Sequence, residues 1–184
     1  MNLPNKISTL RLILIPVFAV IFYVEFPYHY VVAAAVFAVA AFTDFLDGYL
    51  ARKLGLVTDL GKFLDSSADK VLVLAALVFA VDAHLIPFVW GGAFTAIILA
   101  REIMVSCLRM IAAAKGVVMA ADKLGKIKTF LQDIGLVVVI LSGQFSCGAI
   151  KWTGFSIIAL SVAMTIISGV HYFVANKSVL SASN

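Results

Sequence analysis

The chain has 184 residues, of which 63% are hydrophobic and 13% are charged, and its formal net charge is +4. Soluble domains average about 45–50% apolar and about 25% charged residues, so this composition excludes a water-soluble globule, a disordered chain and a coiled coil. It predicts an all-α, polytopic membrane protein that forms a single transmembrane domain over residues 1–184. Ten acidic residues nevertheless occur in this apolar chain, several of them close together, and they indicate where its function lies.

Six apolar segments are long enough to cross a bilayer, which takes about 17–25 helical residues. The first five residues, which include Pro4, predict a short N-terminal interfacial segment that leads into the first span. The expected transmembrane helices cover residues 7–25, 30–52, 63–82, 86–113, 124–144 and 152–175. No linker or internal repeat separates them.

Basic residues gather on one side of this arrangement. With the N-terminus inside, the inner side carries twelve of the fourteen lysines and arginines, namely Lys6, Arg11, Arg52, Lys53, Lys62, Lys70, Arg109, Lys115, Lys123, Lys126, Lys128 and Lys177. Cytoplasmic loops of membrane proteins are enriched in Lys and Arg, so both termini are expected in the cytoplasm. Most of the positive charge then sets topology, and no helix-turn-helix or aromatic platform predicts a nucleic-acid partner.

Four aspartates fall near the inner ends of the second and third spans. Asp44 and Asp47 share a helix face at spacing i, i+3, and Asp65 and Asp69 share one at spacing i, i+4. A short connection with two glycines predicts that these helices run antiparallel with the carboxylates facing each other. Two charges about 4 Å apart interact by about 4 kcal/mol at an effective dielectric of about 20, so the carboxylates require a cation. Oxygen ligands select hard ions such as Mg²⁺, Mn²⁺ or Ca²⁺.

Other interpretations of these aspartates exist. Each one singly suits a helix cap or a pair with a nearby base such as Lys62 or Lys70, but that explanation fits four on two facing helices poorly. A cation channel or transporter is a further alternative, because acidic rings line cation pores. A pore needs a route across the bilayer, whereas these aspartates crowd one interface. Two bridged metal ions, about 3.5–4 Å apart, are instead a known device for displacement at phosphorus.

The aspartates belong to a longer motif. Residues 44–69 read D-x2-D-G-x2-A-R-x8-G-x3-D-x3-D, with all eight fixed positions present. This pattern resembles the signature of the CDP-alcohol phosphotransferases, and the six-span plan is similar to that family too, so the resemblance covers essentially the whole chain. Looser similarities indicate bacterial members whose acceptor is glycerol 3-phosphate. They comprise residues 2–5, Ser8 (where Thr is more usual), Arg11, Pro16, Arg101, Glu102, Arg109 and residues 125–129.

The resemblance implies transfer of a phosphatidyl group from CDP-diacylglycerol to glycerol 3-phosphate, with release of CMP. It implies that Asp44, Asp47, Asp65 and Asp69 hold two metal ions, Mg²⁺ or Mn²⁺. Asp69, the last of the four, would be the base that accepts the proton of the attacking hydroxyl. The expected setting is the cytoplasmic face of a bacterial inner membrane, in contact with membrane lipids, and the expected assembly is a homodimer.

Small and polar residues around the aspartates are expected to bind the nucleotide of CDP-diacylglycerol. They are Asn5, Ser8, Gly48, Ala51, Arg52 and Gly61. Gly48 and Ala51 present a smooth helix face, and Arg52 offers a bidentate fork to phosphate. Helix packing, capping and interfacial anchoring are the structural alternatives for the same residues.

A phosphorylated acceptor requires cations, and the candidates are Arg101, Arg109, Lys123, Lys126 and Lys128. Arg101 lies deep in its span, about two turns from Arg109 on roughly the same face, where an unpaired charge is costly. Arg109 with Lys123 and Lys126 is the preferred phosphate pocket, although the lysines also suit a positive-inside anchor. These cations disfavour serine as acceptor without separating glycerol 3-phosphate from inositol phosphate, and phosphatidylglycerol is another alternative.

Overall fold

The computed structural model describes residues 3–54, 59–117, 119, 123–145 and 147–177, and side chains within 9–43, 67–117, 119, 124–145 and 147–177. Helices are the only regular secondary structure in these ranges. They are α1 (Leu3–Tyr23), α2 (His29–Leu54), α3 (Asp59–Asp82), α4 (Phe88–Ala114), α5 (Lys123–Gln144) and α6 (Gly148–Ala175).

The all-α prediction is confirmed, and each expected span coincides with one helix to within four residues at either end. The interfacial segment expected at residues 1–5 differs from the structure. Among its described residues, Leu3 to Asn5 already belong to α1, which continues without a break. Pro4 permits this because proline in the first turn of a helix removes an N–H group that has no intrahelical partner.

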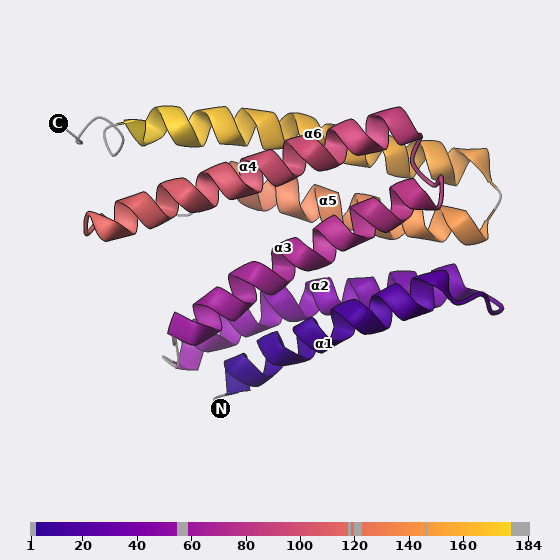
Figure 1. Cartoon of the computed structure of the whole chain (residues 1–184), viewed down its shortest axis with the longest axis horizontal. Helices are drawn as coiled ribbons and strands as arrows, with labels where there is room; N and C mark the ends of the chain where they lie inside the picture. Colours follow the sequence, from indigo (N-terminus) through magenta and orange to yellow (C-terminus); the bar gives the residue numbers. More distant parts are fainter. Residues whose placement is uncertain (1–2, 55–58, 118, 120–122, 146, 178–184) are drawn as a thin grey trace.

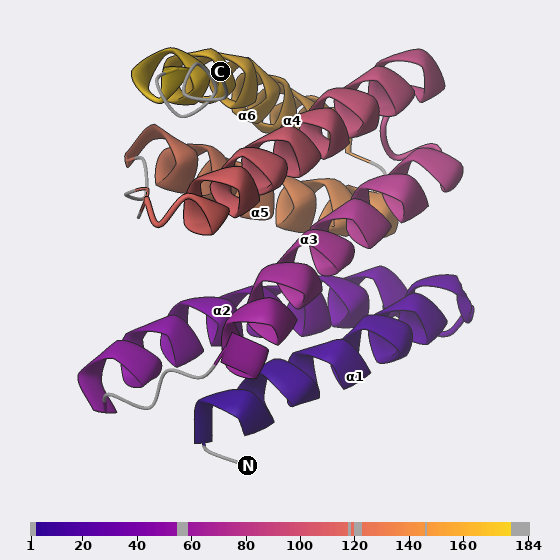
Figure 2. The same ribbon diagram turned by 60° about the vertical axis from the view of Figure 1, so that its left-hand side comes forward.

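The helices run alternately up and down, so their connections alternate between the two ends of the molecule (Figure 1). The start of α1, the α2–α3 and α4–α5 connections and the end of α6 lie at one end. In Figure 2, α1 and α2 form one group, α4 to α6 form another, and α3 crosses between them. Contacts of α3 with α1, α2, α4 and α5 agree with this central position. The helix ends that carry the aspartate motif therefore share one end of the bundle with the α4–α5 connection.

One apolar core joins all six helices. Phe18 of α1 lies at its centre, with ring centroids 5.8 Å from Phe22, 5.9 Å from Phe37 and 5.8 Å from Phe79. Other fully buried members of this core are Leu77, Ile86, Leu136, Ile140 and Ile158. This core occupies the part of the bundle away from the motif, and a second, smaller apolar cluster of Val105, Leu108, Ala112 and Tyr172 lies between the end of α4 and the end of α6.

Large apolar side chains also cover the outside of the molecule. Every helix exposes at least one, among them Val20, Phe42, Val78, Phe88, Phe130 and Val174. Soluble monomers rarely expose extensive apolar surface, so these faces suit contact with lipid. Among the described residues, α6 alone meets the length and composition of a membrane span, with a mean hydropathy of 2.0. The apolar parts of α1 and α2 are shorter, and six crossings of the membrane stay a prediction.

Glycines of α5 and α6 allow these two helices to pack closely. A Cβ atom on Gly154 would lie 2.8 Å from Cγ2 and 3.0 Å from the backbone nitrogen of Val139. A Cβ atom on Gly135 would lie 2.7 Å from Cδ1 of Ile158. Glycine at these positions lets the two backbones approach closely, and this contact fixes how α5 is rotated about its axis.

We expect Gly154→Ala to destabilise the protein by about 1–3 kcal/mol, because the Val139 backbone cannot rotate away from the added methyl group. The matched control is Gly92→Ala, since a Cβ atom on Gly92 meets nothing within 4 Å. That variant should gain up to about 1 kcal/mol from helix propensity. Thermal unfolding of both purified variants in detergent measures the difference, and equal shifts would contradict the close approach of α5 and α6.

Candidate active site

The four motif aspartates lie at the same end of two neighbouring helices. Asp44 and Asp47 fall in the last three turns of α2, and Asp65 and Asp69 fall in the first three turns of α3. The two helices are consecutive, run in opposite directions and are in contact. The side chains of all but Asp69 lie outside the described residues, so the facing of the carboxylates stays a prediction.

The expected nucleotide-binding residues fall at the same end of the bundle by their helix positions. Asn5 and Ser8 are in the first turns of α1, three others are near the end of α2, and Gly61 is near the start of α3. Those three are Gly48, Ala51 and Arg52. The side-chain positions of all six lie outside the described residues, and their role stays a prediction.

Asp69 lies within a cluster of charged side chains from several helices. The charges of Arg11 on α1, Glu102 on α4 and Lys128 on α5 act on its carboxyl group, as does that of neighbouring Lys70. Arg11 is fully buried, and its Nε donates a hydrogen bond to the carbonyl oxygen of Ala40 at 3.3 Å. Burial and the Glu102 carboxylate oppose ionisation of the candidate base, and the three cations around it favour the ionised form.

Glu102 joins two of the predicted acceptor-binding cations. Lys128 donates a hydrogen bond to Oε1 of Glu102, and Nη1 of Arg101 donates to the same oxygen at 3.1 Å. Nη2 of Arg101 also donates to Oγ of Ser168 on α6, at 3.3 Å. The Lys128 side chain is 6% exposed and that of Arg101 is 13% exposed. The shared carboxylate lets the buried Lys128 and the partly buried Arg101 lie side by side, which their mutual repulsion would otherwise oppose.

The other predicted acceptor-binding residues are placed differently. Nε of Arg109 donates to the hydroxyl of Tyr172 at 3.0 Å, and the guanidinium lies 5.5 Å from the centroid of that ring. Lys126 is exposed, and residues two apart on a helix do not share a face, so it points away from Lys128. The Lys123 side chain lies outside the described residues. Among the described cations, the structure thus brings together Arg101 and Lys128 rather than Arg109 and Lys126.

Two polar residues of this region were not predicted from the sequence as site residues. Ser168 is fully buried against Arg101, and Gln132 is buried one helical turn beyond Lys128. The sequence did contain a signal for Gln132, because its i, i+4 spacing from Lys128 places both residues on one face of the helix. Asp133, which the sequence gave no reason to treat as catalytic, interacts electrostatically with Asp69 and Lys128.

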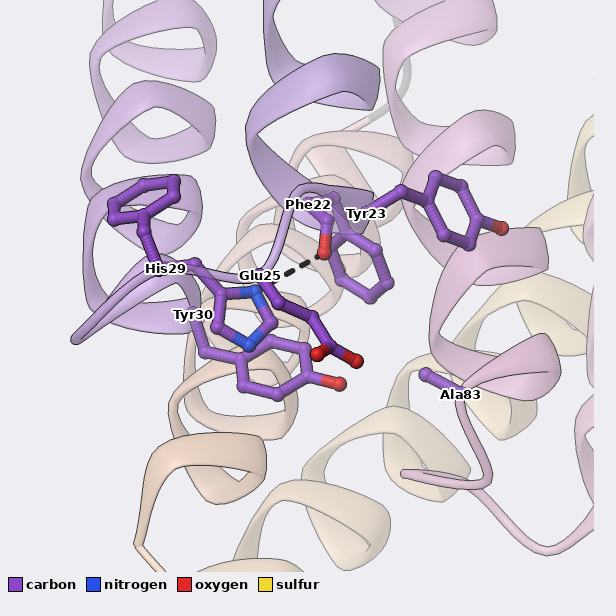
Figure 3. Close-up of a pocket in the computed structure, with 7 residues that line it drawn as sticks. Phe22, Tyr23, Glu25, His29, Tyr30 and Ala83 are labelled. Atoms are coloured by element: carbon purple, nitrogen blue, oxygen red, sulfur yellow. Dashed lines mark hydrogen bonds between the residues drawn. The ribbon is translucent and has the colours of Figure 1, made fainter.

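A cavity of about 650 Å³ lies at the opposite end of the bundle, where α1 meets α2 (Figure 3). Aromatic rings dominate its lining, and His29 packs on Tyr30 with centroids 4.0 Å apart. Nδ1 of His29 lies 3.2 Å from the carbonyl oxygen of Phe22. Among the described residues, the lining contains the carboxylate of Glu25 and neither lysine nor arginine, so this cavity does not suit a phosphorylated substrate.

Comparison with known protein families matches residues 1–177 to the CDP-alcohol phosphatidyltransferases. The chain belongs to this family. This match confirms the family resemblance that the aspartate motif predicted. The enzyme is a membrane-associated transferase of phospholipid biosynthesis.

Relatives of this phosphatidyltransferase match it over most of their length. The CDP-diacylglycerol–glycerol-3-phosphate 3-phosphatidyltransferase of Bacillus subtilis (strain 168) is 41% identical, with 100% of this chain and 99% of the relative covered. The protein of the same name from Rickettsia bellii is 38% identical over 96% of both chains. A probable phosphatidylglycerophosphate synthase of Mycobacterium tuberculosis is 39% identical, with 93% of this chain and 79% of the relative covered.

The ion pair between Glu102 and Lys128 predicts energetic coupling in this phosphatidyltransferase. Glu102→Gln leaves Lys128 buried without its nearest anion and should lower the free energy of unfolding by about 3 kcal/mol or more. In the Lys128→Met background the same substitution should cost at least about 1 kcal/mol less. Denaturation of the four proteins in detergent measures this coupling. Lys126→Met, on the exposed face of α5, serves as the control and should show no coupling to Glu102.

Proposed function

We propose that this chain transfers the phosphatidyl group of CDP-diacylglycerol to sn-glycerol 3-phosphate, giving phosphatidylglycerophosphate and CMP. Family membership and the names of the relatives support the reaction type. The observation that carries the acceptor is the pairing of Arg101 and Lys128 on Glu102, with Lys128 and Glu102 acting electrostatically on Asp69. Two adjacent cations match a phosphate dianion better than serine, which is a zwitterion with a single anionic carboxylate and no net charge.

The residues of the charged cluster divide the work of this reaction. Arg101 and Lys128 hold the phosphate of the acceptor and so orient its free hydroxyl group. Asp69 accepts the proton of that hydroxyl as its oxygen attacks the lipid-side phosphorus. The bond from this phosphorus to the oxygen of CMP then breaks, and CMP leaves with the electron pair. Glu102 keeps the two cations in place when no acceptor is bound.

The aspartate motif is the proposed metal site. Asp44, Asp47, Asp65 and Asp69 supply only oxygen ligands from adjoining helix ends, a donor set that suits two ions of Mg²⁺ or Mn²⁺. When bound, such ions neutralise the pyrophosphate of CDP-diacylglycerol and the charge that develops on CMP. Asn5, Ser8, Gly48, Ala51, Arg52 and Gly61 are proposed to bind the nucleotide.

The proposed setting is the cytoplasmic face of a bacterial inner membrane, with six membrane-spanning helices and both termini in the cytoplasm. The lipid tails of CDP-diacylglycerol favour the bilayer and its nucleotide favours water, so a site near one end of the helices serves both. The exposed apolar side chains on every helix support contact with membrane lipids. A homodimer is proposed from the family resemblance.

Release of CMP from CDP-diacylglycerol tests the proposed function. The purified protein should release CMP when glycerol 3-phosphate and Mg²⁺ or Mn²⁺ are present, and excess EDTA should abolish release. Asp69→Asn should lower kcat at least about 1,000-fold because the base is lost, while the protein remains folded and still binds CDP-diacylglycerol. An active Asp69→Asn variant would contradict the role of Asp69. Release supported by inositol phosphate, but not by glycerol 3-phosphate, would contradict the acceptor.

The acceptor pocket is tested by comparing two lysines of α5. Lys128→Met should raise the KM for glycerol 3-phosphate at least about tenfold, because a charged hydrogen bond to phosphate is lost. Lys126→Met should change it less than about twofold. An unchanged KM for CDP-diacylglycerol in both variants checks that the fold and the nucleotide site are intact. If Lys126→Met has the larger effect, the phosphate binds on the other face of α5, with Arg109 and Lys123.

A further inference from the structure

Gln132 is a buried glutamine whose side-chain oxygen has no hydrogen-bond partner in the described structure. The residue is 3% exposed, and its Oε1 atom has no hydrogen-bond partner among the described groups. A buried polar atom without a partner is costly, and proteins pair the great majority of such atoms. The buried Oε1 atom of Gln132 is therefore available to bind a ligand, and the surroundings of the residue decide which ligand.

The position of Gln132 on α5 points to the active site. Helical residues advance by about 100° each, so Gln132 lies about 40° around the helix from Lys128 and about 100° from Asp133. Both of those residues interact electrostatically with Asp69, so Gln132 lies on the arc of α5 that faces the candidate base. One turn further along the same face, Leu136 is fully buried in the apolar core. Gln132 thus occupies the boundary between the charged cluster and the core.

The chemistry of an amide limits what this residue recognises. Its oxygen accepts hydrogen bonds and its nitrogen donates them, so it matches a neutral hydroxyl group, which also does both. It adds no charge beside Asp69, unlike a carboxylate or an amine. Glycerol 3-phosphate carries two hydroxyl groups, of which one attacks the phosphorus. The second, on carbon 2, lies between the attacking group and the phosphate.

We propose that Gln132 binds the carbon-2 hydroxyl of glycerol 3-phosphate and thereby determines acceptor specificity. This inference rests on the proposed function. With the phosphate held by Arg101 and Lys128, a third contact at carbon 2 fixes the rotation of the acceptor and directs its remaining hydroxyl toward Asp69. A site built to bond a hydroxyl rejects analogues that lack it, because its own polar group is then left unpaired.

The test compares glycerol 3-phosphate with 3-hydroxypropyl phosphate, which keeps the phosphate and the attacking hydroxyl but lacks the hydroxyl on carbon 2. In the wild-type enzyme, kcat/KM should be about 100-fold higher for glycerol 3-phosphate. In Gln132→Leu, kcat/KM for glycerol 3-phosphate should fall about 30-fold or more, while that for 3-hydroxypropyl phosphate stays within about threefold. The preference should therefore shrink to about threefold or less.

A matched control is available on the same helix. Gln144 also has an Oε1 atom without a partner, but it lies twelve residues further along α5, about 18 Å away. Gln144→Leu should keep the wild-type preference. An unchanged KM for CDP-diacylglycerol in Gln132→Leu shows that this variant is folded, and Gln132→Asn provides a second, polar variant with a shortened side chain, expected to show an intermediate preference.

The outcomes separate the inference from the proposed function. An undiminished preference in Gln132→Leu, an equal loss for both acceptors, or the same effect in Gln144→Leu overturns the role of Gln132 and leaves the proposed function standing. A wild-type enzyme that transfers to neither acceptor overturns the proposed function, and the inference with it.

Discussion

The charges buried within this helical bundle must compensate one another, and the contact of Glu102 with Arg101 and Lys128 does so for the part of the chain described. An isolated charge away from water is expensive, and two like charges side by side are more so. One carboxylate oxygen that accepts hydrogen bonds from both cations removes much of that cost. The hydroxyl oxygen of Ser168 accepts a further hydrogen bond from Arg101. Helices α4, α5 and α6 are therefore linked by polar contacts near Asp69 of α3, in addition to the apolar core that joins all six helices.

This compensation is also what makes the cluster suitable for chemistry. Cations held in place before the substrate arrives lose little freedom when they bind it, and burial strengthens their attraction for phosphate. The close packing of α5 on α6 fixes the face of α5 that carries Lys128 and Gln132. Apolar packing thus determines the rotation of α5, and this rotation places Lys128 next to Glu102. The described lining of the aromatic cavity at the other end of the bundle contains no such cations, and we assign this cavity no part in the proposed reaction.

The sequence was sufficient to predict the helical architecture, since six apolar stretches and their polar breaks are local features. The sequence was also sufficient to identify the family, because the aspartate motif consists of residues at fixed spacings within two adjacent helices. The partner of Lys128 was not predictable in the same way. Glu102 lies on another helix, and Lys126 carries the same charge as Lys128. Only the rotation of α5, set by its contact with α6, decides which lysine faces inward.

Product analysis under competition tests the central claim, that the paired cations Arg101 and Lys128 select glycerol 3-phosphate as the acceptor. The purified enzyme would receive CDP-diacylglycerol, Mg²⁺ and equal concentrations of glycerol 3-phosphate, inositol phosphate, serine and phosphatidylglycerol, and mass spectrometry would identify the lipid formed. The account predicts phosphatidylglycerophosphate as the dominant product, with one CMP released per lipid. A dominant product derived from serine or phosphatidylglycerol would contradict a phosphate-binding role for Arg101 and Lys128. A dominant inositol product would contradict the choice of acceptor.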